Sequence, residues 1–343
     1  MDAVPTLIEP ESPSRDDGAE SDPAAGSDPS PEPDTASDGP APPDGGHPVA
    51  WPERGITLVI VAAATLFTLA QLQPDLLVAD TTPTGGDMGA HVWGPAYLRD
   101  TLLPQGRLVG WTPDWYAGFP AYQFYMVVPS LAIVALDVLL PYGIAFKLVT
   151  VVGIVALPTA AWAFGRLTRL RFPGPALLAA ATLPFLFDTE FTIYGGNIAS
   201  TMAGEFAFSI SLALAVLYLG VAARGLETGR HRAIAAVLLA LTGLCHLIPA
   251  FFALAGTAVL LVLPTTRRTT SRADGTVTTA VPSGAGADRA GSPEAVSTGS
   301  RLTRVAGERL RWLIPVGVVA GLLSAFWVLP FYARRSFLND MGW

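Results

Sequence analysis

One uncharged apolar stretch decides the fold class: residues 148–165, which read LVTVVGIVALPTAAWAFG. As an α-helix rising about 1.5 Å per residue it measures roughly 27 Å, close to the hydrocarbon core of a bilayer at about 30 Å. Five further runs have the same apolar character: Ile56–Leu72, Phe172–Phe187, Phe206–Ala223, Ala233–Leu263 and Leu313–Ala333. The sequence therefore predicts an all-α, polytopic membrane protein with about 7–8 membrane segments.

The composition agrees with that class. The 343 residues are 51% hydrophobic and 14% charged, whereas a soluble domain has about 25% charged residues. No basic stripe supports nucleic-acid binding. Cys245 is the single cysteine, so an intrachain disulfide and a thiolate metal cage are excluded. Walker-type loops, His-Glu-x-x-His and Gly-x-Ser-x-Gly are absent from the sequence, which leaves ATP hydrolysis, zinc proteolysis and serine hydrolysis without support.

Two polar segments flank the apolar part. Residues 1–50 hold twelve acidic residues, one arginine and eleven prolines, and such a segment buries too little apolar surface to fold. We expect residues 1–50 to be a disordered acidic tail and residues 264–312 a disordered linker, both cytoplasmic. Residues 313–343 are expected to form the last membrane helix and an external end, and the chain is expected to be either truncated there or a short member of its kind.

Arginine clusters predict the orientation. They occupy residues 166–171, 224–232, 267–272 and 301–311, and positively charged loops remain in the cytoplasm. A plasma-membrane domain then spans residues 51–263, with a cytoplasmic N-terminus and external loops at 74–123 and 188–205. The short run Phe124–Leu136 is expected to be re-entrant, unless the arginine cluster at 166–171 departs from the positive-inside rule. Ala233–Leu263 is too long for one crossing and is expected to bend as a hairpin near His246–Pro249.

The first external loop contains the strongest candidate for a catalytic residue. Asp87 follows Gly85-Gly86 and precedes His91 by four residues, so a helix starting at Asp87 puts both side chains on one face. One interpretation is a general base at the membrane surface, with His91 as its partner. The alternative is that Asp87 is a helix N-cap.

The second external loop contains paired acids. Asp188 and Glu190 point the same way in an extended chain, where they can orient an acceptor hydroxyl or hold a divalent cation. The alternative is that they mark a helix end at the water boundary. Gly195-Gly196-Asn197 predicts a turn where backbone meets a ligand or another helix, and Glu205 is interpreted as a structural charge at a helix start.

Aromatic residues are dense in the first loop, with nine from Trp93 to Tyr125. They either anchor the chain at the interface or line a groove for a sugar or a polyprenyl chain. The expected substrate-binding residues are Arg99, Arg107, Trp111, Trp115, Tyr116, Tyr194 and Asn197. His246 is an intramembrane candidate whose alternative role is to satisfy the carbonyls of a broken helix. Lys147 either snorkels or meets a phosphate.

These residues carry a resemblance to a known family. Gly85-Gly86-Asp87-Met-Gly-Ala-His91, Gly106-Arg107, Trp111-Thr-Pro-Asp-Trp115 and Gly118-Phe-Pro120 resemble the opening of large actinobacterial membrane proteins labelled 6-pyruvoyl-tetrahydropterin synthase-related. The arrangement is similar to the GT-C superfamily of integral-membrane glycosyltransferases. There, external loops carry catalytic acids, and Asp87 and Asp188-Thr-Glu190 match those places.

The resemblance implies sugar transfer from a polyprenyl-phosphate donor to a glycan or lipid of the cell envelope. Asp87 would be the base, Asp188 and Glu190 would orient the acceptor or bind a divalent cation, and Arg99 or Arg107 would neutralise the leaving phosphate. Two alternatives stay open: a transporter or lipid-handling protein that uses the broken helix around His246, and a non-catalytic scaffold that binds envelope-assembly proteins.

Overall fold

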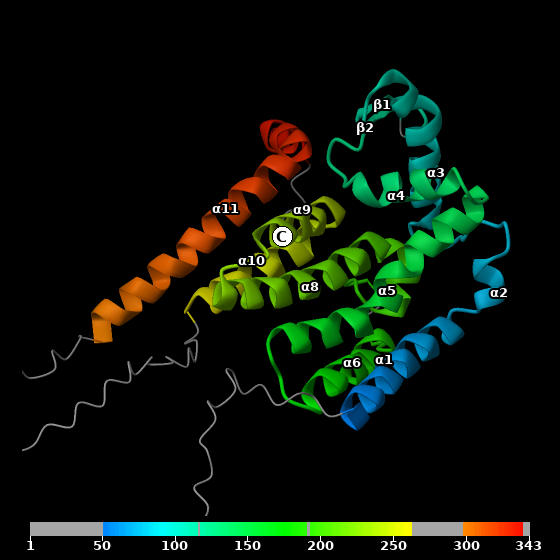
Figure 1. The fold of residues 1–343 in the computed structure, drawn as a ribbon. Coiled ribbons are helices and arrows are strands. Elements are labelled where there is room, and N and C mark those ends of the chain that lie inside the picture. The colour runs from blue at the N-terminus through cyan, green and yellow to red at the C-terminus, as the bar shows by residue number, and fades with distance from the viewer. Residues whose placement is uncertain (1–50, 116, 191–192, 263–297, 339–343) are drawn as a thin grey trace, which may run out of the picture. The chain divides into compact units, whose positions relative to one another are not determined.

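The computed structural model describes residues 51–115, 117–190, 193–262 and 298–338 (Figure 1). The expected tail at 1–50, Tyr116 and most of the expected linker lie outside the described residues. The elements in chain order are α1 (Trp51–Gln71), α2 (Pro74–Leu77), α3 (Met88–Tyr97), the π-helix η1 (Leu98–Leu102), the 3₁₀ turn η2 (Leu103–Gln105), β1 (Gly110–Thr112), β2 (Phe119–Ala121), α4 (Val128–Asp137), α5 (Tyr142–Leu167), α6 (Gly174–Leu186), α7 (Ile198–Ser200), the π-helix η3 (Thr201–Glu205), α8 (Phe206–Thr228), α9 (Arg232–Cys245), α10 (Leu247–Val262), α11 (Thr298–Ala333) and the 3₁₀ turn η4 (Arg335–Phe337).

The structure corrects two details of the predicted organisation. The all-α prediction missed a small antiparallel hairpin, in which Gly110 of β1 lies opposite Ala121 of β2. The linker prediction extended too far, because α11 begins at Thr298. Apolar side chains are sparse from Thr298 to Glu308, so the hydropathy pattern gave no sign of a helix there.

Four helices among the described residues are long and apolar enough to cross a membrane: Trp51–Gln71, Tyr142–Leu167, Ile198–Thr228 and Val305–Ala333. The helices α4, α6, α9 and α10 are apolar but shorter. The helical membrane-protein class therefore agrees with the structure.

The helices α5 and α8 lie side by side (Figure 1). They pack closely because glycines lie at their interface. A Cβ atom on Gly153 would lie 2.4 Å from the backbone of Ser209, and one on Gly220 would lie 2.9 Å from the Cα of Phe164. Small residues let helix backbones approach in this way. Gly153 contacts Ser209, and Phe164, later in α5, contacts Gly220, later in α8. The helices α5 and α8 therefore run parallel, and their N-terminal ends lie together.

The predicted arginine clusters at 166–171, 224–232 and 301–311 are represented at one end of the helices, and the cluster at 267–272 lies outside the described residues. Arg169 Nε lies 3.3 Å from Glu227 Oε2, the indole of Trp312 donates to the carbonyl of Arg230 at 3.0 Å, and Arg309 Nη1 donates to the carbonyl of Leu261 at 2.6 Å. We call this the arginine end. The helices α9 and α10 both reach it, so they form the expected hairpin. The break falls at His246, whose backbone is extended, three residues before Pro249.

Both predicted external loops lie at the other end, which we call the loop end. Lys147 of α5 anchors the first of them, because its ammonium donates to the carbonyls of Leu76 and Ala79. The indole of Trp327 in α11 donates to the carbonyls of Tyr122 and Tyr125. The short helix α4 packs against α3 and α5 here.

Candidate functional site

The two loops meet at a backbone contact. The N–H of Asp87 donates to the carbonyl of Ala203 at 2.8 Å. A Cβ atom on Gly86 would lie 2.2 Å from that same carbonyl oxygen, and Gly86 has a φ of +51°. Only glycine combines that backbone conformation with so close an approach. Gly86, the second glycine of the pair before Asp87, is therefore required where the first loop touches η3.

The π-helix η3 is shaped to receive Asp87. Gly204 within it has a φ of +134°, and a Cβ atom there would lie 3.0 Å from the Cβ of Asp87 and 3.2 Å from the His91 ring. Glu205 is the last residue of this π turn and directly follows Gly204. Single π turns inside helices occur often at functional sites. The carboxylate of Glu205 interacts electrostatically with that of Asp87.

Five ionisable or polar side chains gather around this contact, and we call them the Asp87–Glu205 cluster: Asp87, His91, Tyr125, Glu205 and His246. The His91 ring lies 5.6 Å from the Tyr125 ring, centroid to centroid. His246 Nε2 lies 3.7 Å from Glu205 Oε2. Asp87 occupies the N-cap position of α3, but its side chain makes no capping hydrogen bond. The exposed carboxylate of Asp87 therefore does not cap α3.

Burial and charge act in opposite directions on His91. Burial lowers the pKa of its imidazole below 6.5, and the nearby negative charge of Asp87 partly offsets that shift. The ring is therefore neutral at neutral pH. Burial and the negative charges of Glu205 and Asp87 raise the pKa of the Tyr125 hydroxyl. The Tyr125 hydroxyl therefore stays protonated at neutral pH and can donate a hydrogen bond.

A hollow of about 750 Å³ adjoins the cluster. Tyr125 belongs to both, since it also lines the hollow. Aromatic side chains make up much of the wall, and the polar members are Gln123 and Arg334. The lining residues are Val109, Gly110, Trp111, Phe119, Pro120, Tyr122, Gln123, Phe124, Tyr125, Arg334 and Phe337. Trp111, predicted as a substrate-binding residue, is 65% exposed and lies in this wall.

Other predicted first-loop residues have structural partners. Arg99 Nη1 lies 2.6 Å from Asp137 Oδ2 and Arg99 Nε lies 2.6 Å from Asp100 Oδ1, so its guanidinium ties η1 to α4. Trp115 packs edge-on against Trp93 at 6.1 Å inside the loop's own aromatic cluster. Arg107 is exposed.

The predicted acids of the second loop fold onto their own loop. Asp188 Oδ1 accepts the N–H of Glu190 at 3.0 Å, and Asp188 Oδ2 accepts the hydroxyl of Tyr194 at 2.7 Å. These bonds lower the pKa of Asp188. Asn197 donates to the Asp188 carbonyl at 2.8 Å and caps α7 by accepting the N–H of Ser200.

This turn replaces the expected extended geometry, in which both carboxylates point the same way, because the Asp188 side chain bonds back to its own backbone. Glu190 is exposed. No group of three or more His, Cys, Asp or Glu side chains in the described ranges is placed to hold a metal ion.

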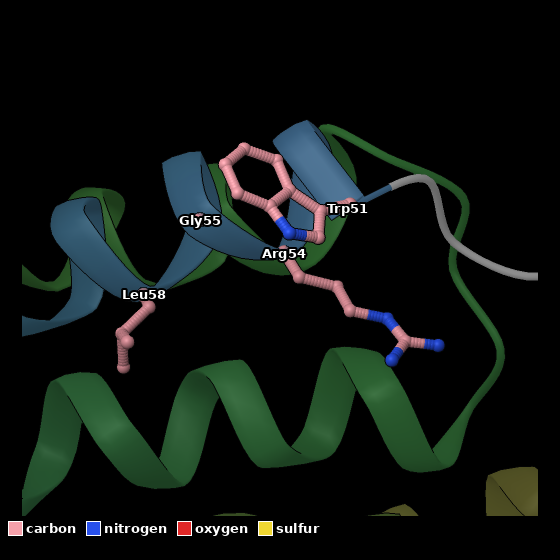
Figure 2. A pocket seen from close by; sticks show the side chains of 4 residues that line it. All are labelled: Trp51, Arg54, Gly55 and Leu58. Carbon is pink, nitrogen blue, oxygen red and sulfur yellow. The ribbon is translucent and has the colours of Figure 1, made fainter.

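A second hollow of about 450 Å³ lies along α1 and is lined by Trp51, Arg54, Gly55 and Leu58 (Figure 2). All four come from the first two turns of one helix. None is an acid or a nucleophile, so this hollow offers no catalytic group.

Comparisons with protein-family models, with curated proteins and with solved structures gave no match. The geometry of the Asp87–Glu205 cluster and of the hollow beside it is therefore the basis for inferring a function.

The sequence reasoning missed three residues of this site. Glu205 was interpreted as a charge at a helix start, although Gly204 before it was a signal of unusual backbone. Tyr125 was grouped with the other aromatics. Arg334 received no role, although arginine at the end of an apolar run that leads to the predicted external face departs from the positive-inside pattern.

Proposed function

We propose that the chain is a multi-pass membrane glycosyltransferase that moves a sugar from a polyprenyl-phosphate donor to a glycan or lipid of the cell envelope. One observation carries the proposal. The exposed carboxylate of Asp87 is held beside Glu205 and His91, at the end of an apolar helix bundle and next to an aromatic-lined hollow. Apolar ring faces of a sugar and isoprene units both pack well on aromatic walls.

In the proposed reaction Asp87 is the general base. It takes the proton of an acceptor hydroxyl as that oxygen attacks the anomeric carbon of the donor sugar. The bond between the anomeric carbon and the phosphate oxygen breaks, and polyprenyl phosphate leaves with the electron pair. Neutral His91 orients Asp87 or the acceptor hydroxyl. Glu205 supports the positive charge that develops at the sugar ring.

Glu205 takes the place that the resemblance gave to Asp188 and Glu190. The Asp188 carboxylate already accepts two hydrogen bonds within its own loop. Glu205, in contrast, interacts electrostatically with Asp87. The proposal therefore assigns Asp188, Tyr194 and Asn197 to the shape of the second loop, and it needs no divalent cation at Asp188 and Glu190.

The proposal also fixes an orientation. The arginine end faces the cytoplasm together with the N-terminus, and the loop end faces outward. In this arrangement α6, α9 and α10 accompany the four long helices, which gives seven membrane segments in the plasma membrane. The transporter alternative relied on His246 as a separate site. However, His246 lies 3.7 Å from Glu205 and so belongs to the same cluster.

The test is made in cells that lack the protein. Full-length wild type, Asp87→Asn and Asp75→Asn are expressed in turn, and the envelope glycans are profiled by mass spectrometry. Asp75 is the matched control because it is an exposed acid of the same loop outside the cluster. Wild type and Asp75→Asn should restore one and the same glycan, and Asp87→Asn should not. Identical profiles with and without the protein would remove the proposal.

A further inference from the structure

The hollow beside the cluster contains an unusual pair of polar side chains. Arg334 Nη1, at the end of α11, donates to Gln123 Oε1 at 2.7 Å. Within the described part of the chain no carboxylate pairs with Arg334. Gln123 is 5% exposed, and its buried Nε2 donor makes no hydrogen bond in this structure. An exposed cation thus lies in the wall of the hollow, bonded to an amide whose buried donor has no partner.

Such a pair matches an anionic oxygen ligand. A buried amide donor without a partner is unfavourable, so a rotation of the Gln123 amide that lets a ligand oxygen accept from it removes this penalty. A guanidinium is suited to phosphate because its planar fork of donors matches two phosphate oxygens. Arg335, the next residue, lies over the Tyr332 ring at 4.0 Å instead. Only the first of two adjacent cations therefore lines the hollow.

The surroundings indicate that the phosphate is carried on a lipid. Phe119, Phe124 and Phe337 line the same hollow, which gives apolar walls next to the cation. Arg334 directly follows the candidate membrane span Val305–Ala333 of α11. A hollow at the end of a spanning helix lies within reach of a ligand whose hydrocarbon tail remains in the bilayer.

We propose that Arg334 and Gln123 bind the phosphate of a polyprenyl-phosphate lipid in this hollow. The inference builds on the proposed function, because Tyr125 connects the hollow to Asp87 and Glu205. With the phosphate at Arg334, the sugar lies along the aromatic wall and its anomeric carbon faces the Asp87–Glu205 cluster. Arg334, in place of Arg99 or Arg107, then stabilises the charge of the leaving phosphate.

The experiment measures binding of undecaprenyl phosphate to the full chain in detergent micelles, read from quenching of tryptophan fluorescence and checked by native mass spectrometry. Trp111 lies in the hollow and serves as the reporter. Arg334→Gln should weaken binding about tenfold or more, since a charge-assisted hydrogen bond contributes about 1.5–3 kcal/mol. Arg335→Gln removes the same charge one residue away and should leave binding unchanged.

A second variant separates binding from folding. Gln123→Glu keeps a partner for Arg334 and makes it an ion pair, so the wall stays intact, but it puts a negative charge where the phosphate should lie. It should abolish binding while the thermal unfolding midpoint is kept. Equal loss in Arg334→Gln and Arg335→Gln, or full binding by Gln123→Glu, would overturn the inference.

Two further ligands identify the source of the phosphate. Inorganic phosphate and phosphatidylglycerol should each bind much more weakly than undecaprenyl phosphate, and equal binding of either would overturn the polyprenyl assignment. Asp87→Asn should still bind undecaprenyl phosphate. Loss of the glycan in Asp87→Asn and loss of lipid binding in Arg334→Gln are thus measured separately, so the proposed function and this inference can fail independently.

Discussion

The backbone N–H of Asp87 donates to the carbonyl of Ala203 at 2.8 Å, which joins two loops that are separated in sequence by α4, α5 and α6. The contact is made by backbone atoms and by glycines, so it does not depend on the chemistry of the carboxylate itself. It holds the exposed Asp87 side chain beside Glu205.

The contact depends on the missing Cβ of Gly204. Gly204→Ala adds a methyl group 3.0 Å from the Cβ of Asp87 at a φ of +134°, so both crowding and backbone strain act on it. We expect a loss of about 1–3 kcal/mol in the free energy of unfolding. Gly89→Ala is the matched control, because Gly89 lies in α3 with open space around it. Thermal unfolding of both variants decides the matter, and an unchanged midpoint for Gly204→Ala contradicts the prediction.

The two acids of the cluster should act on one product. Glu205→Gln and Asp87→Asn are each expected to remove the glycan that wild type restores, because both carboxylates belong to one site. Glu190→Gln should leave that glycan in place, since Glu190 is exposed and outside the cluster. Mass spectrometry of the envelope glycans measures the difference. If Glu190→Gln removed the glycan and Glu205→Gln did not, the second acid would be misassigned.

His91 predicts a pH dependence of stability. Its folded pKa lies below the value of about 6.5 in an unfolded chain. Its contribution to stability is therefore complete above pH 6.5 and declines as the pH falls through the folded pKa, because the unfolded state takes up the proton first. His91→Phe retains an aromatic ring but does not titrate. Wild type should lose more stability than His91→Phe below about pH 6.5, and parallel unfolding profiles from pH 8 to pH 5 would show that His91 does not contribute.

Arg99 should be structural. Arg99→Gln leaves Asp137, whose side chain is 12% exposed, without its ion-pair partner, and we expect a loss of about 1 kcal/mol or more in unfolding free energy. Arg107→Gln removes an exposed cation of the same loop and should leave the unfolding midpoint unchanged. Polyprenyl-phosphate binding should be the same in both variants. If Arg99→Gln kept full stability but bound polyprenyl phosphate more weakly, Arg99 would belong to the donor-binding site.

Sequence patterns predicted the features that depend on nearby residues. The i, i+4 spacing of Asp87 and His91 and the break before Pro249 are local, and arginine clustering indicated which helix ends lie together. The Asp188 turn was also a local feature, yet it was predicted as extended, because an Asp that bonds to the second N–H after it and one in a strand have the same sequence spacing.

The rest of the site depends on contacts between distant parts of the chain. Glu205 lies near Asp87 because the parallel helices α5 and α8 place their N-terminal ends together. Arg334 reaches Gln123 because α11 also contacts this loop through Trp327, whose indole donates to Tyr122 and Tyr125. A hydropathy profile contains neither relationship. The hairpin β1–β2 was missed for a different reason, since each of its strands has only three residues and short strands leave no periodic pattern.

The most direct test of the central claim is a transfer assay with the purified full chain in lipid nanodiscs. The donor is the radiolabelled polyprenyl-phosphate-sugar fraction extracted from cells that lack the protein, and the acceptor is their envelope glycan fraction. The account predicts that wild type moves label into the glycan and releases polyprenyl phosphate, and that Asp87→Asn does so about 10²–10⁴-fold more slowly. Equal rates for wild type and Asp87→Asn would contradict it.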